Sequence, residues 1–362
     1  MVVKGVAPSG RPLLNVVLRL SNTGVMVEDS DVIIRFLEPH ESEVLVELIK
    51  ESYGDSYDAE WVYDAEKIAE RIRNNTLRST IGQLNDGTIL GHMALMVEEG
   101  VERVLHAGIA VVRDAARGHH LFERLKRFGS QWATEAGYLG IFSEATAAHP
   151  YSQKANIKLG AHETGILLGW IPDTVHNNAA VNLEGHRQSV VLFYLKLNHG
   201  DLRNMYVPKK YYEMVQKILE VSGLHAVIAQ VPTNVTVPNE TIFSIEEKVD
   251  HNSAIIHVTE PGKDFTEAIE SARVTLMTNK RRDAVYLDVP LDLPHTEIVL
   301  NNQVSDFSFS FAGIFPNQLR HGDVLRLQAF NGVDLHSADI VTASDHGREL
   351  LEYVIADLRP DR

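Results

Sequence analysis

The segment from Ala110 to Phe122 brings together small, basic and helix-starting residues in an order that suits an anionic ligand. An apolar run that ends at Val112 leads into the turn Arg113–Gly118, and a helical pattern follows. The first amides of a helix lack intrahelical partners and its dipole favours negative charge, while small side chains let a ligand approach the backbone. The residues alone therefore predict a phosphate or pyrophosphate site near Arg117–Phe122.

Local charge supports the same prediction. The formal net charge of the chain is −15, yet the stretch from Val111 to Ser130 is basic. Its charged residues are Arg113, Asp114, Arg117, Glu123, Arg124, Lys126 and Arg127, with His119 and His120 among them. A basic segment in an acidic chain indicates a local anion site, and the alternative interpretation is a solvated helix face.

Composition limits the class of protein. A length of 362 residues predicts about two domains, and 44% hydrophobic with 23% charged residues is typical of globular proteins. Without cysteine the chain has no disulfides, thiolate metal sites or cysteine nucleophiles. Its acidity disfavours nucleic-acid binding, because phosphate contacts need clustered Lys and Arg. No apolar run reaches the roughly 20 residues that span a bilayer, and residues 1–30 lack a signal-peptide core, so we expect no membrane association and a cytoplasmic location.

Strands and helices are predicted on both sides of the basic segment. Val104–Val112 reads as a buried strand, and Leu121–Trp132 repeats its apolar residues on one helical face until Gly137 ends the helix. Asp86-Gly87 between two apolar runs predicts a β-hairpin. The other expected elements of this part are strands at Val32–Phe36, Ser79–Leu84, Thr88–Val97, Leu139–Ser143, Thr164–Trp170 and Ser189–Leu197, and helices at Pro39–Glu51, Ala65–Asn74 and His149–Leu159.

A second domain is predicted at residues 199–362, after a leader at residues 1–30 and a first domain at residues 31–198. From Ala254 onward its order of elements, β-α-β-α-β-β, repeats the second half of the first domain, though not its sequence. Its expected strands are Ala226–Val231, Thr241–Glu246, Ala254–Val258, Ala284–Val289, Phe307–Phe311 and Val324–Phe330, and its expected helices are Lys209–Val221, Phe265–Met277, Glu297–Val304 and Asp345–Leu358.

The turn after Val112 resembles the acetyl-CoA motif of the GNAT superfamily of N-acetyltransferases, R/Q-x-x-G-x-G/A. Arg117-Gly118-His119-His120-Leu121-Phe122 matches it at the arginine and the following glycine. It departs where the family usually has its two later small residues, because His120 and Phe122 stand there. This departure shifts the expected contacts with pyrophosphate from side chains to backbone amides.

Two further segments resemble the family in the same order along the chain. Thr88–Leu95 is similar to the strand pattern I-V-G-x-A-x-L, and His149–Ala161 is similar to N-P-A-A-L-R-L-Y-E-K-L-G-F. The resemblance covers roughly Val32–Leu197. It implies an α/β (α+β) fold with a GNAT-like mixed, mostly antiparallel sheet flanked by helices, followed here by a second α+β domain.

The resemblance also implies an activity and a cofactor. In the family an amine attacks the thioester carbonyl of acetyl-CoA directly. The enzyme must polarise the carbonyl, remove a proton from the amine and stabilise the leaving thiolate. The residues expected to bind acetyl-CoA are Ala110, Val111, Val112, Arg117, Gly118, His119, His120, Leu121, Phe122 and Asn156.

The expected catalytic residues include one departure from the family. The usual thiolate donor is the tyrosine of L-Y-x-K, and Asn156 stands at that position. An amide can donate a hydrogen bond but supplies no proton as an acid, so Ser152 or Tyr151 could act instead. Glu144 is the expected base, with a surface or capping carboxylate as the alternative. His106 is a second candidate base, and its alternative is a hydrogen-bonded core histidine.

The loop between the first two helices is the expected acceptor site. Its residues Tyr57, Trp61 and Tyr63, together with nearby acids, could hold a cationic amine by cation–π contact and ion pairing. Core anchoring or an interface is the alternative role for these aromatics. No histidine falls into a recognised metal-ligand spacing, and His119 and His120 point in different directions on a helix, so no metal is expected.

Three functions fit these observations. The leading expectation is an acetyl-CoA-dependent N-acetyltransferase acting on a small-molecule or peptide amine. A non-catalytic acyl-CoA sensor is the alternative that Asn156 favours, and a nucleotide-binding protein is the third. The second domain lacks the R-x-x-G-x-G/A pattern, and Glu260, Pro261 and Asp264 make a poor pyrophosphate site. It is expected to be a degenerate GNAT-like half or an unrelated α+β domain. Exposed strand edges make a homodimer plausible.

Overall fold

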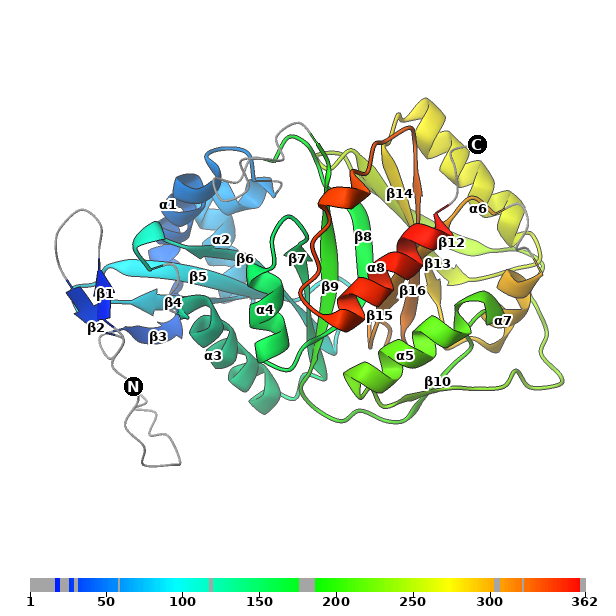
Figure 1. Ribbon diagram of the computed structural model, residues 1–362, viewed down its shortest axis with the longest axis horizontal. Coiled ribbons are helices and arrows are strands. Elements are labelled where there is room, and N and C mark those ends of the chain that lie inside the picture. The colour runs from blue at the N-terminus through cyan, green and yellow to red at the C-terminus, as the bar shows by residue number, and fades with distance from the viewer. Residues whose placement is uncertain are drawn as a thin grey trace.

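The computed structural model describes residues 17–19, 26–28, 32–57, 59–116, 120–175, 186–302, 307–320 and 322–358. Figure 1 shows one long sheet along the molecule, with the N-terminal elements at one end and the C-terminal elements at the other. Within the described residues, none of the helices has the length and apolar character needed to cross a membrane.

The N-terminal part runs to residue 198. Its strands are β1 (Val17–Arg19), β2 (Met26–Glu28), β3 (Ile33–Phe36), β4 (Leu77–Gln83), β5 (Ile89–Met96), β6 (Val104–Val112), β7 (Gly140–Thr146), β8 (His162–Ile171) and β9 (Gln188–Lys196). Its α-helices are α1 (Ser42–Tyr53), α2 (Ala65–Arg73), α3 (Leu121–Glu135) and α4 (Tyr151–Lys158).

The C-terminal part begins with a short strand pair. Its strands are β10 (Arg203–Met205), β11 (Ala226–Ile228), β12 (Ile242–Lys248), β13 (Ser253–Glu260), β14 (Ala284–Pro290), β15 (Ser310–Phe315) and β16 (Val324–Phe330). Its α-helices are α5 (Tyr212–Ser222), α6 (Phe265–Val274), α7 (Pro294–Asn301) and α8 (Asp345–Asp357).

Local chemistry explains several of these boundaries. The Asp64 carboxylate accepts hydrogen bonds from the amides of Glu66 and Lys67 and so caps the start of α2. At the β4–β5 turn the Asp86 carboxylate accepts from the Thr88 amide, and Gly87 takes a φ of 95°. The predicted hairpin and first-domain helices are therefore found, with ends shifted by a few residues.

Twelve strands form one sheet in the order β12-β13-β14-β16-β15-β8-β9-β7-β6-β5-β4-β3. Neighbouring strands are antiparallel except for the pairs β6·β7 and β13·β14, which are parallel. The expected mixed, mostly antiparallel sheet flanked by helices is confirmed. Its two parallel pairs each enclose a crossover helix, α3 or α6, which is the connection that parallel neighbours require.

The two faces of the N-terminal sheet are covered by different helices. A cluster beneath α3 contains Leu121 and Leu125 with Leu105 and Ala107 of β6. A second cluster joins α1 and α2 to the opposite face. Helix α3 lies very close to the sheet at Gly129, where an added Cβ would be 3.0 Å from Leu95 Cδ1. Helix α3 therefore rests directly on the sheet at this turn.

The C-terminal part repeats the strand order of the N-terminal part. Strands β6, β7, β9 and β8 lie in that spatial order, and β13, β14, β16 and β15 lie in the same order with the same pair directions. The last strands of the two repeats, β8 and β15, are neighbours. The order of elements expected from Ala254 onward is the order found.

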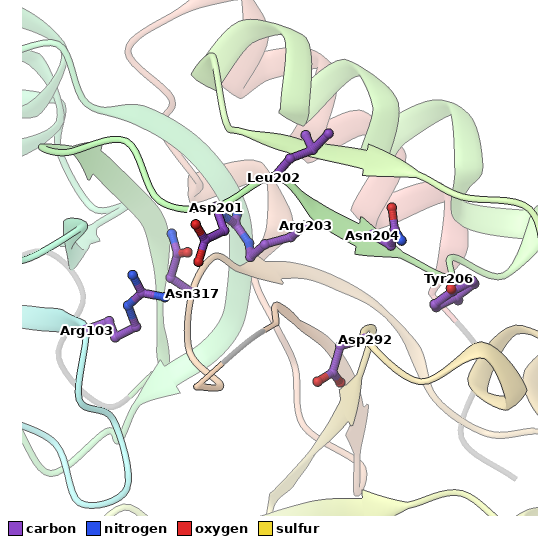
Figure 2. A pocket seen from close by; sticks show the side chains of 8 residues that line it. All are labelled: Arg103, Asp201, Leu202, Arg203, Asn204, Tyr206, Asp292 and Asn317. Atoms are coloured by element: carbon purple, nitrogen blue, oxygen red, sulfur yellow. The ribbon is translucent and has the colours of Figure 1, made fainter.

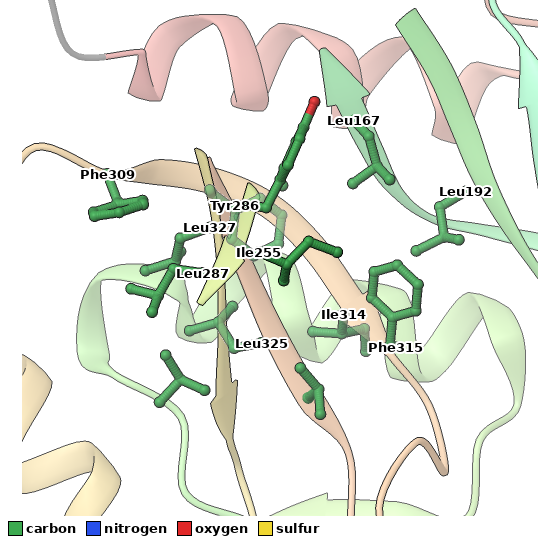
Figure 3. Packing of buried hydrophobic residues seen from close by; sticks show 14 of the residues in the cluster. Leu167, Leu192, Ile255, Tyr286, Leu287, Phe309, Ile314, Phe315, Leu325 and Leu327 are labelled. Carbon is green, nitrogen blue, oxygen red and sulfur yellow. The ribbon is translucent and has the colours of Figure 1, made fainter. Parts of the chain in front are cut away.

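The two parts join through a short backbone contact and a shared core. Strand β15 pairs with β8 at Gly313 and Gly165, where an added Cβ at Gly165 would be 2.6 Å from the Ala312 carbonyl oxygen. Gln328 accepts a hydrogen bond from the Leu168 amide across this junction. Figure 3 shows side chains of β8 and β9 in the same apolar cluster as those of the C-terminal strands.

Two expected strands of the C-terminal part differ from the structure. The strand expected at Phe307–Phe311 begins instead at Ser310, because Phe307 packs its ring against Phe265 of α6 at 5.6 Å rather than entering the sheet. The strand expected at Ala226–Val231 is shorter, since β11 finds a partner only along the short β10. The apolar pattern thus reported burial at Phe309, whereas at Ala226–Val231 it marked half-buried and exposed residues, with Val227 44% exposed.

Candidate functional site

The central strands β6 and β7 separate part of the way along their length. Their parallel pairing runs from Val104–Gly140 to His106–Phe142, while β6 continues to Val112 and β7 to Thr146. A cavity of about 300 Å3 lies where they part. Beyond His106, the edge of β6 that faces β7 therefore borders an opening and pairs with no described strand, while its other edge stays paired with β5.

A bulge in β6 shapes this opening. The pairing of β5 with β6 passes from His92–Val111 to Ala94–Gly108, so β6 carries one extra residue there. Ile109 has a φ of 49°, which is unusual for a β-branched residue. The extra residue changes which face of the sheet the following side chains of β6 point to. Ala107 packs beneath α3, whereas Ile109, two residues later, packs beneath α1 and α2.

A buried histidine holds the bulge in place. His92 Nδ1 lies 2.9 Å from the Ile109 carbonyl oxygen, and its Nε2 lies 2.8 Å from Ser79 Oγ. Because a carbonyl only accepts, the neutral ring donates from Nδ1 and accepts the Ser79 hydroxyl at Nε2. Burial lowers the pKa of His92 to about 4, so the ring is neutral at physiological pH.

On the face covered by α1 and α2, a carboxylate stands at the opening. Glu144 Oε2 lies 3.3 Å from His106 Nε2, and His106 Nδ1 lies 2.7 Å from Glu98 Oε1. Burial alone would lower the pKa of His106, but the carboxylates of Glu144 and Glu98 outweigh it and raise that pKa to about 10. His106 is therefore a cationic neighbour of Glu144, and a protonated ring has no free lone pair with which to act as a base.

On the opposite face, beneath α3 and α4, a lysine is buried at the same opening. Lys126 of α3 is 1% exposed, and its Nζ donates to Ser143 Oγ at 3.2 Å and to Asn156 Oδ1. The Ser143 hydroxyl also donates to Asn156 Oδ1, at 3.1 Å. Burial lowers the pKa of Lys126 to about 7. Successive residues of β7 point to opposite faces of the sheet. The Glu144 carboxylate and the Lys126 amine, which contacts Ser143, therefore lie on opposite sides of one gap.

Two polar atoms at the start of α4 are buried next to this cluster. Ser152 Oγ and His149 Nδ1 have no hydrogen-bond partner among the described residues, and both side chains line the cavity. Asn156 Nδ2 donates to the Ser152 carbonyl oxygen at 3.1 Å. Buried polar groups without protein partners are uncommon, and at a cavity they are suited to contact a ligand. The expected site residues Ser152, Asn156 and Glu144 are thus brought together around one cavity.

The basic segment is less available to an anion than its charge suggested. Arg113 forms a two-point ion pair with Glu51 at 2.8 Å, and Arg127 pairs with Glu123 at 2.9 Å. Of the residues expected to bind acetyl-CoA, Ala110 and Phe122 line the cavity. Val111 is buried beneath α1 and α2, and Leu121 is buried beneath α3.

The start of α3 is described only from His120 onward. His120 precedes the first turn of α3 with a φ of 58°, and its Nδ1 lies 3.5 Å from Glu123 Oε2. Val112 pairs with Gly91 of β5. The expected residues Arg117, Gly118 and His119 lie outside the described residues, so their proposed contacts with pyrophosphate stay a prediction.

The aromatic residues expected to hold the acceptor divide into two groups. Tyr57 lines the cavity and packs against Tyr53, which lines it too, with ring centroids 4.8 Å apart. Trp61 and Tyr63 do not line it. The Trp61 ring lies under Arg71 at 4.3 Å, and the Tyr63 hydroxyl accepts a hydrogen bond from the Tyr57 amide at 2.9 Å. Those two residues position the loop.

At the equivalent place in the C-terminal repeat lies an ion cluster. Where β13 and β14 part, His257 Nδ1 lies 3.1 Å from Asp288 Oδ2, and Asp288 forms a two-point ion pair with Arg326 at 2.6 and 2.7 Å. Before α6, the Asp264 carboxylate accepts from the Thr241 amide at 2.7 Å. An added Cβ on Gly262 would be 2.3 Å from the backbone of Glu240. Side chains and backbone of this repeat are therefore engaged with one another at the end of the β13–β14 pairing and before α6.

A second cavity, of about 310 Å3, lies at the other end of β6. Figure 2 shows Arg103, Asp201 and Asn317 on its walls, with contributions from both parts of the chain. Its buried arginine, Arg203, is already paired with Asp323 at 3.0 Å. In the described part of the chain, no group of three or more histidine and acidic side chains is arranged to hold a metal ion.

Sequence reasoning missed Lys126 and His92 as site residues. Lys126 belongs to the basic segment, and its spacing from Phe122 and Gly129 also places it on the apolar face of α3. A lysine on that face is a detectable signal. His92 carries no such signal, because its role depends on a bulge in the neighbouring strand.

No protein-family model matches the chain, and no curated protein matches it significantly. Many solved structures do. A mutant form of the spermidine/spermine N-acetyltransferase from Vibrio cholerae matches with 15% identity and a TM-score of 0.38, over 47% of this chain and 95% of that one. A phosphinothricin acetyltransferase from Sinorhizobium meliloti, in complex with acetyl-CoA, matches with 16% identity and a TM-score of 0.39, over 47% and 90%.

The ribosomal-protein-S18-alanine N-acetyltransferase from Escherichia coli matches with 12% identity and a TM-score of 0.37, over 47% of this chain and 96% of that one. These three proteins are named as acetyltransferases, and the S. meliloti protein is described as a member of the GNAT superfamily. At these identities the similarity concerns the fold alone.

Proposed function

We propose that the chain is an acyl-CoA-dependent N-acyltransferase, which transfers an acetyl group from acetyl-CoA to a primary amine in the gap between β6 and β7. The observation that carries the proposal is this gap, which reaches through the sheet with a carboxylate on one face and a buried amine on the other. A direct transfer needs two reactants to meet from two sides, and the gap provides that arrangement.

Each group at the gap has a role in such a reaction. Backbone amides at the bulge near Ile109 would polarise the thioester carbonyl, because strand amides without partners are preorganised donors. Glu144, held by the charged His106, would take the proton that the attacking amine releases. Asn156 and Ser152 would contact the thioester from the side of α4.

The acceptor would enter from the side of Tyr53 and Tyr57. Their rings form one wall of the cavity, and Glu144 is the nearby acid. An aromatic wall beside a carboxylate suits a cationic or neutral amine that carries an apolar or extended chain. A small-molecule or peptide amine therefore fits this side better than an anion does.

The alternative is a non-catalytic acyl-CoA sensor, and one observation favours it. Asn156 occupies the position where the resemblance places a tyrosine, and both ends of its amide are already engaged with Lys126, Ser143 and the Ser152 carbonyl. An amide so held cannot serve as an acid. A sensor would bind acetyl-CoA tightly without turning it over.

Thiol release from acetyl-CoA with a panel of primary amines separates the two functions. Because the chain has no cysteine, a thiol reagent would report free coenzyme A without background from the protein. We expect amine-dependent release with at least one class of amine. Calorimetric binding of acetyl-CoA without release across polyamines, amino acids and peptide N-termini would support the sensor, and no binding at all would remove both.

The C-terminal part is proposed to be a GNAT-like repeat that has lost its own site. Its strand order supports the repeat, and the Asp288–Arg326 cluster supports the loss. The division near residue 199 remains part of this proposal. A homodimer is also a proposal, and sedimentation of the full chain would test it.

A further inference from the structure

We propose that Lys126 is the proton donor to the leaving thiolate, in place of the tyrosine that Asn156 replaces. The inference rests on the proposed acyl transfer and adds a catalytic residue to it. Lys126 lines the cavity from α3, and its Nζ donates to Asn156 Oδ1 and to Ser143 Oγ. The ammonium therefore stands beside the side chain that the sequence assigns to the thiolate position.

The surroundings of Lys126 give it no structural partner of opposite charge. Its side chain is 1% exposed, yet within the described residues no carboxylate lies at salt-bridge distance from Nζ. The neighbouring carboxylate Glu123 on α3 pairs instead with Arg127 and Lys158. A buried ammonium without a counterion destabilises a fold, so its presence at a cavity indicates a role in function.

Asn156 and Ser143 hold this ammonium without removing its ability to transfer a proton. Both provide neutral oxygen acceptors, which orient the Nζ hydrogens but take up no proton. The Asn156 amide is itself fixed by its bond to the Ser152 carbonyl oxygen. The asparagine and the buried lysine are therefore joined in one hydrogen-bonded cluster at the cavity.

The proposed step balances atoms and charge. The neutral amine attacks the thioester carbon, a C–N bond forms, and its extra proton passes to Glu144. Collapse of the tetrahedral intermediate breaks the C–S bond, and the electron pair stays on sulfur. The thiolate then takes one proton from the Lys126 ammonium, which leaves a neutral amine. Solvent returns a proton to Lys126 and removes one from Glu144, so the products are an amide and the free thiol.

The charge state of Lys126 suits a donor near neutral pH. Burial lowers the pKa of Lys126 to about 7, well below the usual value for a lysine, so the ammonium gives up its proton more readily. The groups that face it are Ser143 of β7 and Asn156 of α4, both neutral, and His149 also lines the cavity. Glu144 lies on the other face of β7. Turnover should therefore fall as pH rises through the pKa of Lys126.

The test compares Lys126→Met with the wild type and with Lys67→Met. Lys67 lies on α2, is exposed, and has its Nζ 3.9 Å from Asp64 Oδ2. The Lys67→Met variant therefore serves as a control that loses one lysine away from the cavity. We expect Lys126→Met to lower kcat for thiol release by about 100-fold or more. Its affinity for coenzyme A and its Tm should not fall, because methionine fills the site without a buried charge. The alkaline fall in rate should disappear in that variant only.

Three results would overturn the inference. If Lys126→Met retains the wild-type kcat, Lys126 supplies no proton. If the variant is slower only because it is less stable or binds coenzyme A more weakly, Lys126 has a structural role. Should Lys126→Met fail to fold, Lys126→Gln keeps a hydrogen-bond donor but has no acidic proton, and wild-type turnover in it would contradict the role. A wild type that releases no thiol with any amine removes the proposed function itself.

Discussion

At the scale of single residues, the site depends on how β7 presents successive side chains. Ser143 points to the side of Lys126, and Glu144 points to the side of His106. The proposed proton acceptor, Glu144, and the proposed proton donor, Lys126, thereby lie on opposite faces of the sheet. Two groups in different surroundings can hold different protonation states in one reaction.

His92 gives a prediction for stability against pH. Its folded pKa is lowered from 6.5 to about 4, so the unfolded chain takes up a proton at His92 before the folded chain does. Between those two values the free energy of unfolding should fall by about 1.4 kcal/mol for each unit of falling pH from this residue. Urea unfolding of the wild type and of His92→Phe, measured from pH 7 to pH 4, would show this contribution.

His92→Phe should lose part of that pH dependence and should be less stable at pH 7 by about 1–3 kcal/mol, since the Ile109 carbonyl and the Ser79 hydroxyl lose their partner. Exposed His40 offers a control, and His40→Gln should leave both measurements unchanged. An identical pH profile in His92→Phe and the wild type would show that His92 is not the buried neutral group described here.

At the scale of elements, the position of α3 decides where Lys126 lies. Gly129 is one turn further along α3 and allows the helix to rest on Leu95, Met93 and Thr80. A large side chain at residue 129 would meet Leu95, Met93 and Thr80 and push the helix away from the sheet. Lys126 would then move relative to Asn156, which belongs to α4 and would not follow.

Gly129→Leu should therefore lower the free energy of unfolding by about 1–3 kcal/mol and also reduce thiol release. Gln131→Leu adds the same side chain at an exposed position of α3 and should change neither. Thermal unfolding and initial rates of both variants provide the measurement. A stable Gly129→Leu variant with full activity would show that close packing of α3 does not set the site.

The elements around the site could largely be predicted from sequence, and the site itself only in part. The periodicity of Leu121–Trp132 and the turn at Asp86-Gly87 specify a helix and a hairpin through local rules. The bulge at Ile109 could not be predicted, because an isoleucine gives no local signal for a positive φ. Pairing of Arg113 with Glu51 also depends on tertiary contacts, which charge counting along the chain does not contain.

At the scale of the whole molecule, the two repeats share one sheet and one core. Leu167 and Leu192 of the first part lie in the same cluster as Leu287 and Phe315 of the second (Figure 3). The Tyr286 hydroxyl donates to the Leu168 carbonyl oxygen at 2.8 Å across the junction. The sequence predicted two units of similar element order, but only the spatial strand order reveals how β8 and β15 bring them together.

The full chain should therefore unfold in one cooperative thermal transition. A chain cut at residue 198 would expose apolar side chains such as Leu192 and Tyr194, which are at most 1% exposed in the full chain, and should not fold stably. Differential scanning calorimetry of the full chain provides the measurement. Two separate transitions, or a residue 1–198 fragment with its own transition at a similar Tm, would show that the parts are independent.

The central claim is that the thioester of acetyl-CoA enters the gap between β6 and β7, and amide hydrogen exchange tests it most directly. With acetyl-CoA added to the full chain, exchange should slow in peptides that cover residues 107–112 and 151–156, and it should stay unchanged around residues 259–264 before α6. Slower exchange confined to residues 259–264, or to the second cavity near Arg103 and Asn317, with no change at residues 107–112, would contradict this placement of the site.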